Sequence, residues 1–175
     1  MNLSKRNKYI FVGAVFVLAL SHVLWDYFHG GVPEHYLLHR KDMPKFSNWW
    51  SVVTIPMFSC IALTVIRRKY QNEETGRTPI PKKVLYGFIC AFLLGTLETV
   101  LFYTMEEFAG YPILSTFVVA LFLPIHRVYF ILGFVLGMTY GFGGVIPILA
   151  GVILMGIYVL EYEILRKGFL RLIRR

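Results

Sequence analysis

Long apolar runs constrain this chain more than any other feature of its sequence. Residues 9–28 form the first run, and an α-helix of that length rises about 30 Å, which is enough to cross the hydrocarbon core of a bilayer. Apolar residues make up 57% of the chain and charged residues only 16%, against about 25% in a typical soluble domain. The sequence therefore predicts an all-α, polytopic transmembrane helix bundle that occupies residues 1–175 as a single domain. Three further runs are long enough to span: 49–66, 84–103 and 145–165.

Two shorter apolar pieces, 111–123 and 128–140, lie between the third and the last of these runs. Each would rise only about 20 Å as a helix, so neither crosses a bilayer comfortably. A break containing Pro124, His126 and Arg127 separates them. Glycines concentrate in and after the second piece, and they fit either close helix packing or irregular backbone covered by protein. These glycines are Gly133, Gly137, Gly141, Gly143, Gly144 and Gly151.

The distribution of basic residues predicts the number of crossings. Most of the eighteen Lys and Arg residues fall in the N-terminus, in the loop from 67 to 83 and in an amphipathic tail at 163–175. Basic segments beside membrane helices favour the cytoplasmic face, where anionic lipid attracts them. An even number of crossings follows, which favours four full spans plus a short, Gly-rich broken helix pair, six elements in all. One helix over residues 112–140 is the alternative, and it would give five spans.

This interpretation places the protein in the plasma (inner) membrane, with both termini cytoplasmic. The net charge of +8 is explained by basic clusters that flank the spans and face anionic lipid. Nucleic acid is therefore not expected as a partner. The expected partners are the bilayer itself and anionic lipid at the cytoplasmic face. A second copy of the chain or another membrane protein is a further candidate.

Histidines and one aspartate form the strongest candidate site. His22, Asp26 and His29 follow one another at i, i+4 and i+7, so they share one helical face, and His35 and His39 follow in the next loop. Imidazole and carboxylate are the usual ligands of transition metals such as zinc, iron or copper. The pattern predicts a transition-metal site at the extracytoplasmic side. A polar structural role or a contact with substrate is the alternative, because no spacing such as HExxH is present.

Glu98 is the second candidate, because it lies within an otherwise apolar run. An ionisable residue there is costly and by default functional, so Glu98 is expected to carry a proton or to pair with His22 or Arg127. His126 and Arg127 form the third candidate. In a cytoplasmic turn they simply obey the positive-inside rule, whereas in a re-entrant hairpin they could contact an anionic head group.

Three functions remain open on these observations, and the sequence does not decide whether the protein is an enzyme. In the first, the polar pocket holds a metal ion or cofactor that acts on a lipophilic substrate. In the second, the protein binds or transports a small molecule or lipid, with the Gly-rich pair as its irregular element. In the third, the chain is an accessory subunit of a larger membrane complex.

Overall fold

The computed structural model describes residues 2–36, 42, 44–72 and 75–165, and it is almost entirely helical. Six α-helices form most of this described part of the chain, and two of them are too short to cross a bilayer unaided. Four helical segments are long and apolar enough to span a membrane: Lys5–Phe28, Asn48–Tyr70, Lys82–Thr104 and Val145–Leu165. The helices are α1 (Lys5–Phe28), α2 (Ser51–Tyr70), α3 (Lys82–Thr104), α4 (Tyr111–Phe122), α5 (Val128–Phe142) and α6 (Val145–Leu160).

Short elements complete the described chain. Helix α2 is preceded by the 3-10 turn η2 (Asn48–Trp50), and α4 by the 3-10 turn η3 (Glu106–Phe108). Helix α6 continues into a turn of π-helix, η4 (Glu161–Leu165). The predicted polar loop after the first span contains a small antiparallel hairpin of β1 (Glu34–Tyr36) and β2 (Lys45–Ser47), a detail that the sequence analysis did not anticipate.

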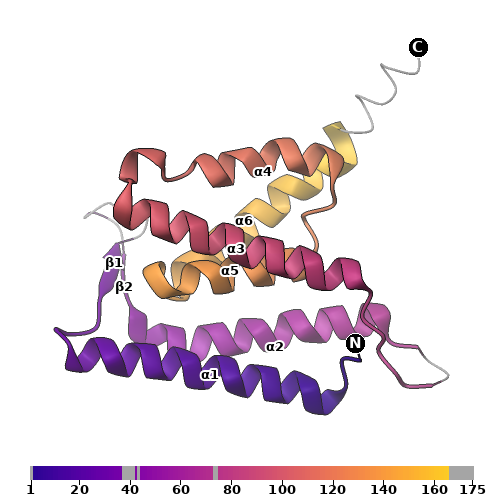
Figure 1. Cartoon of the computed structure of the whole chain (residues 1–175), viewed down its shortest axis with the longest axis horizontal. Helices are drawn as coiled ribbons and strands as arrows, with labels where there is room; N and C mark the ends of the chain where they lie inside the picture. The colour runs from indigo at the N-terminus through magenta and orange to yellow at the C-terminus, as the bar shows by residue number, and fades with distance from the viewer. Residues whose placement is uncertain (1, 37–41, 43, 73–74, 166–175) are drawn as a thin grey trace.

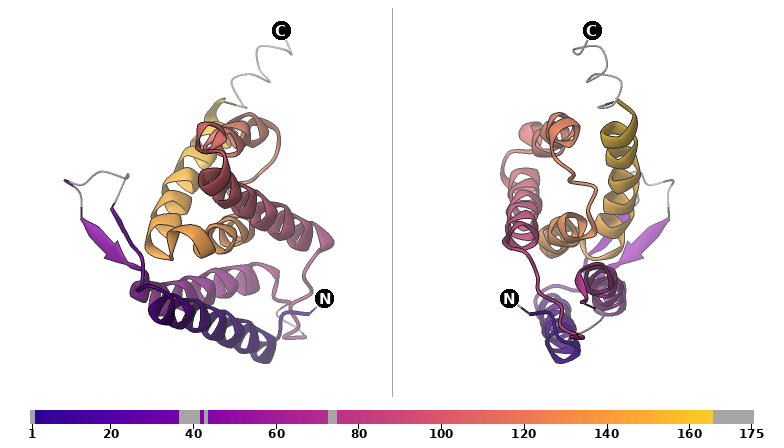
Figure 2. Two further views of the ribbon diagram at one scale, coloured as in Figure 1. Left: turned by 60° about the vertical axis from the view of Figure 1, so that its left-hand side comes forward. Right: turned by 90° about the vertical axis from the view of Figure 1, so that its right-hand side faces the viewer.

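The helices are stacked from one edge of the bundle to the other. Figure 1 shows α1 and α2 side by side along one edge, with α3 and α5 stacked above them and α4 at the opposite edge. Helix α6 crosses this stack obliquely, as both views in Figure 2 show. The chain passes back and forth, so that the N-terminus, the α2–α3 loop, the α4–α5 loop and the end of α6 lie toward the same side of Figure 1.

Large apolar side chains cover much of the outer surface. Leu18, Leu93, Val118 and Ile153 come from four different helices, and each is more than half exposed. Many exposed apolar side chains of this size are unfavourable in water but suit contact with lipid. The exposed surface is therefore compatible with the membrane location predicted from the sequence.

Helices α3 and α5 form the most intimate contact in the bundle. A Cβ atom added at Gly133 would lie 2.2 Å from the carbonyl oxygen of Phe88, and one at Gly137 would lie 2.2 Å from that of Phe92. In the reverse direction, a Cβ atom at Gly95 would lie 2.4 Å from the carbonyl oxygen of Phe134. Backbone thus packs directly against backbone, as small residues allow in membrane helices. The sequence left two roles open for these glycines, close helix packing and irregular backbone. Gly133 and Gly137 serve close helix packing.

The α5–α6 turn uses its glycines differently. Gly143 has a φ of +67°, a conformation that side chains rarely adopt, and a Cβ atom there would meet the side chain of Asn48. The N–H of Gly144 donates to Oγ of Ser51 at 2.8 Å in a buried position. The turn is therefore fixed against the start of α2.

The predicted pair of short elements is present as two separate helices. The chain leaves helical conformation between Phe122 and Val128, so the single long helix of the five-span alternative is wrong. Helix α4 has 12 residues and α5 has 15, which correspond to about 18 and 22 Å. Most of the predicted amphipathic tail, residues 166–175, lies outside the described residues.

Candidate functional site

His22 and Asp26 are close together near the end of α1, as their i, i+4 spacing predicts. Nδ1 of His22 lies 3.9 Å from Oδ2 of Asp26, and both side chains are largely buried. Oδ2 of Asp26 is buried without a hydrogen-bond partner among the described residues. The His22 ring also packs on the ring of Tyr140 from α5, with 4.7 Å between centroids. This pair joins α1 to α5 at the end of the bundle opposite the N-terminus.

The other predicted ligands do not complete a metal site. His29 follows the last residue of α1, and its ring stacks on Trp25 while Nδ1 lies 2.9 Å from the Trp25 carbonyl oxygen. His39 and the side chain of His35 lie outside the part of the chain that the structure describes. Among the described residues, no three His, Cys, Asp or Glu side chains come close enough to hold a metal ion. The structure therefore gives no support to the predicted metal site.

Glu98 is buried, but its partner differs from those expected. Its Oε1 accepts a hydrogen bond from the backbone N–H of Gly110 at 2.6 Å, instead of pairing with His22 or Arg127. Gly110 has a φ of +90° and precedes the first turn of α4. The carboxyl group thus ties the α3–α4 turn to α3 and lies at the positive end of the α4 dipole. Oε2 of Glu98 is buried without a partner within the described chain.

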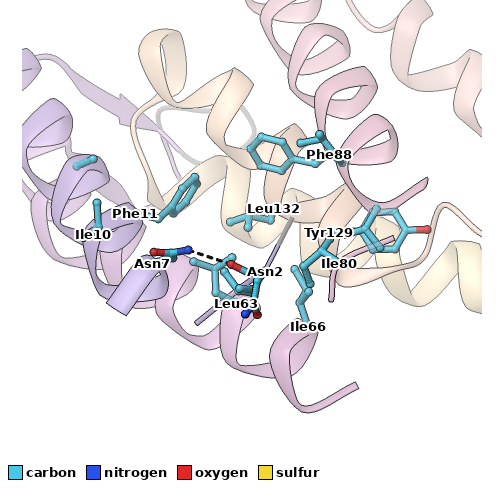
Figure 3. A pocket seen from close by; sticks show the side chains of 14 residues that line it. Asn2, Asn7, Ile10, Phe11, Leu63, Ile66, Ile80, Phe88, Tyr129 and Leu132 are labelled. Carbon is cyan, nitrogen blue, oxygen red and sulfur yellow. Dashed lines mark hydrogen bonds between the residues drawn. The ribbon is translucent and has the colours of Figure 1, made fainter. Parts of the chain in front are cut away.

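An apolar cavity of about 440 Å³, which we call the apolar chamber, lies between α1, α2, α3 and α5 near the N-terminal end (Figure 3). Phe11 from α1, Leu63 from α2 and Phe88 from α3 project into it, and Leu132 of α5 forms its floor. Among the described residues of its wall, Asn2 and Asn7 are the amide side chains, and Tyr129 adds one phenol group. Ligand sites commonly have volumes of about 300–1,000 Å³ and a mostly apolar lining. The remaining residues of the wall are Leu3, Ile10, Ala14, Ile66, Ile80, Val84, Leu85 and Tyr129.

The N-terminal segment and the α2–α3 loop close one end of the apolar chamber together. The N–H of Leu3 donates to the carbonyl oxygen of Thr78 at 2.9 Å, and the N–H of Thr78 donates to Oδ1 of Asn2 at 3.0 Å. Nδ2 of Asn7 donates to the backbone oxygen of Asn2 at 2.9 Å (Figure 3). These bonds engage the backbone of this edge of the cavity, whereas Oγ1 of Thr78 is buried without a partner among the described residues.

A second cavity of about 230 Å³, the basic pocket, adjoins the apolar chamber. Ile66 and Tyr129 line both cavities and form the wall between them. Lys69 at the end of α2, together with His126 and Arg127 before α5, gives the basic pocket its charge. Burial and the neighbouring Arg127 charge lower the pKa of His126, so its ring is held neutral. The other residues that line the basic pocket are Val65, Tyr70 and Val128.

Sequence reasoning singled out His126 and Arg127 but missed the other members of this site. Lys69 is part of the Arg67–Lys69 cluster, which in sequence indicates only the end of a membrane span. Tyr129 is one aromatic residue among many in an apolar run. The chamber could not be found from the sequence, because its walls come from four helices and the N-terminal segment.

Comparisons with known proteins give no further guidance. No protein-family model, no curated protein and no solved structure matches this chain.

Proposed function

We propose that this protein is a multi-pass membrane protein that binds a lipophilic molecule, drawn from the bilayer, in the apolar chamber. The observation that carries the proposal is the cavity of about 440 Å³ between α1, α2, α3 and α5. Its apolar lining would stabilise a hydrocarbon chain through dispersion contacts, and the side chain of Asn7 at its edge is bonded to the backbone of Asn2. Binding of a lipid or small molecule, with or without transport, is thus the function that the geometry favours.

The close contact between α3 and α5 supports this proposal. Gly133 and Gly137 bring the two backbones together beside the chamber, and Leu132 of the same helix forms the cavity floor. Helix α1, in contrast, faces the chamber with Ile10, Phe11 and Ala14. The cavity therefore has one side formed by the closely packed helices α3 and α5, and an opposite side formed by α1.

A substitution that fills the cavity tests the proposal. Ala14→Phe adds a ring from α1 into the chamber, whereas Val17→Phe adds the same ring at an exposed position of the same helix outside it. The protein in detergent is titrated with dioleoylglycerol, and bound lipid is counted by native mass spectrometry. We expect Ala14→Phe to lower binding about tenfold and Val17→Phe to leave it unchanged. Equal binding by both variants and the wild-type protein would refute the proposal.

We further infer that an even number of crossings, made by four full spans with or without the short pair α4 and α5, places both termini on the cytoplasmic side of a plasma (inner) membrane. The alternation of the helices gathers most of the described basic residues at the end of the bundle where α1 begins, and the acidic residues Glu106 and Glu107 lie toward the opposite end. This asymmetry agrees with the positive-inside rule. The basic residues at the first end are Lys5, Arg6, Lys8, Arg67, Arg68, Lys69, Arg77, Lys82, Lys83 and Arg127.

Cysteine labelling in intact cells tests this orientation. Thr75 and Glu107 are exposed in loops at opposite ends, and Cys60 and Cys90 are first replaced by Ala to remove background labelling. A membrane-impermeant maleimide is expected to label Glu107→Cys and to spare Thr75→Cys until the cells are opened. The reverse labelling pattern would show that the orientation is inverted.

A further inference from the structure

We propose that the basic pocket binds the phosphate head group of a membrane lipid whose hydrocarbon chain occupies the apolar chamber. This inference rests on the proposed function, and it narrows the ligand to a lipid with a phosphate monoester. The geometry points to it because an apolar cavity and a cationic cavity share one wall, formed by Ile66 and Tyr129. A lipid of this class has the same division into an apolar chain and a compact anion.

The charge of the basic pocket favours an anion. Lys69 and Arg127 come from separate elements, α2 and the α4–α5 break, yet they line one cavity of about 230 Å³. No Asp or Glu is among the described residues that line this cavity, while the carboxylate of Glu163 acts electrostatically on His126. Two like charges that share a small cavity repel each other, and a phosphate between them would replace this repulsion with charge-assisted hydrogen bonds.

The uncharged donors of the basic pocket fit the same ligand. Tyr70 and Tyr129 contribute phenol groups to its wall, and His126 contributes an imidazole whose buried Nδ1 has no hydrogen-bond partner in the described chain. A phosphate monoester offers several acceptor oxygens, so it can accept hydrogen bonds from hydroxyl, imidazole and guanidinium groups together. The lining of the pocket thus supplies both the charge and the donors that a phosphate needs.

The location of the basic pocket favours a lipid as the source of the phosphate. It lies at the end of α2 and the start of α5, on the side of the bundle where the other basic residues gather. Head groups of one leaflet lie at that level when the helices cross the membrane. The adjoining chamber extends from this level toward the interior of the bundle, as a lipid chain does.

The experiment compares three ligands with the full-length protein in detergent: dioleoyl phosphatidic acid, dioleoylglycerol and inorganic phosphate. Native mass spectrometry counts the bound lipid, and inorganic phosphate is added as a competitor. The wild-type protein is expected to bind phosphatidic acid at least about tenfold more tightly than dioleoylglycerol. Lys69→Gln and Arg127→Gln are each expected to lower this preference about tenfold, while binding of dioleoylglycerol stays unchanged.

Two control variants separate the pocket from general charge effects and from misfolding. Arg77→Gln removes one positive charge on the same side of the bundle but outside both cavities, so it should keep the preference. Arg127→Lys keeps the charge and should keep most of the preference, and its unfolding temperature reports whether substitution at this position is tolerated.

The possible outcomes decide between the inference and its alternatives. Equal affinity of the wild-type protein for the two lipids, or an equal loss in Arg77→Gln, would overturn the assignment of the head group. If millimolar inorganic phosphate displaced phosphatidic acid and the lipid chain added nothing to the affinity, the basic pocket would be a site for free phosphate instead. In each of these cases, weaker dioleoylglycerol binding in Ala14→Phe would still support the proposed function, so the two failures are distinguishable.

Discussion

Replacing Gly137 by alanine is expected to force α3 and α5 apart. The new Cβ atom would lie 2.2 Å from the carbonyl oxygen of Phe92 and 2.8 Å from the amide nitrogen of Thr96, whereas ordinary contact begins at 3.4 Å. The shortfall to the Phe92 oxygen is about 1.2 Å. Both neighbouring atoms belong to the backbone of α3, so no side-chain rotation can relieve the clash and the helices themselves must separate.

The energetic cost follows from that separation. A radial gap of about 0.5–1 Å already removes a quarter to a half of the dispersion energy of each contact, and overpacking typically costs about 1–3 kcal/mol. We expect Gly137→Ala to lie at the upper end, with a loss of about 3 kcal/mol. For a chain of this size, such a loss lowers the unfolding temperature by roughly 6–12 °C. Gly133→Ala should behave alike, because its Cβ atom would meet the Phe88 oxygen at the same distance.

Thermal unfolding in detergent, followed by tryptophan fluorescence, measures this effect. Gly156→Ala is the matched control, because it makes the same substitution within α6 and a Cβ atom there meets nothing within 4 Å. It should change stability by less than about 1 kcal/mol, since alanine is the better helix former. If Gly137→Ala were as stable as Gly156→Ala, the reasoning about backbone contact between α3 and α5 would be refuted.

Three further predictions concern buried polar groups. Glu98→Gln keeps an acceptor for the N–H of Gly110 and should lower the free energy of unfolding by less than about 1 kcal/mol. Glu98→Leu removes that acceptor and should lower it by about 1–3 kcal/mol. Equal unfolding temperatures for the two variants would contradict this structural role. Tyr158→Phe removes the buried hydrogen bond with Thr116 and should cost about 1 kcal/mol in chemical unfolding, with no effect expected if that bond does not form. Because burial lowers the pKa of His126 below its usual 6.5 in the folded state, the unfolded chain binds the proton more readily, so stability should fall as the pH drops below about 6.5. His126→Gln should reduce this pH dependence of the unfolding temperature, and an unchanged profile would assign it to other groups.

The apolar pattern of the sequence is sufficient to predict the helical class and the approximate position of each described α-helix. Apolar runs of the right length can bury their backbone polar groups in lipid only as helices, so run length fixes each element locally. The predicted spans 9–28 and 84–103 fall within α1 and α3, and the break at Pro124 separates α4 from α5 as expected. The spacing of His22 and Asp26 also predicted their proximity, because it depends on one helix alone.

The contacts between side chains of different helices could not be predicted from the sequence and became visible in the folded structure. It placed Glu98 beside Gly110 instead of His22, stacked His29 on Trp25, and brought Lys69 next to Arg127 around one cavity. The physical reason is that helix periodicity constrains neighbours on one helix, whereas contacts between helices depend on how closely two backbones approach. In this bundle the glycines of α3 and α5 allow the backbones of these two helices to touch. The apolar chamber lies between α1 and α3, where no such glycine contact brings the two backbones together.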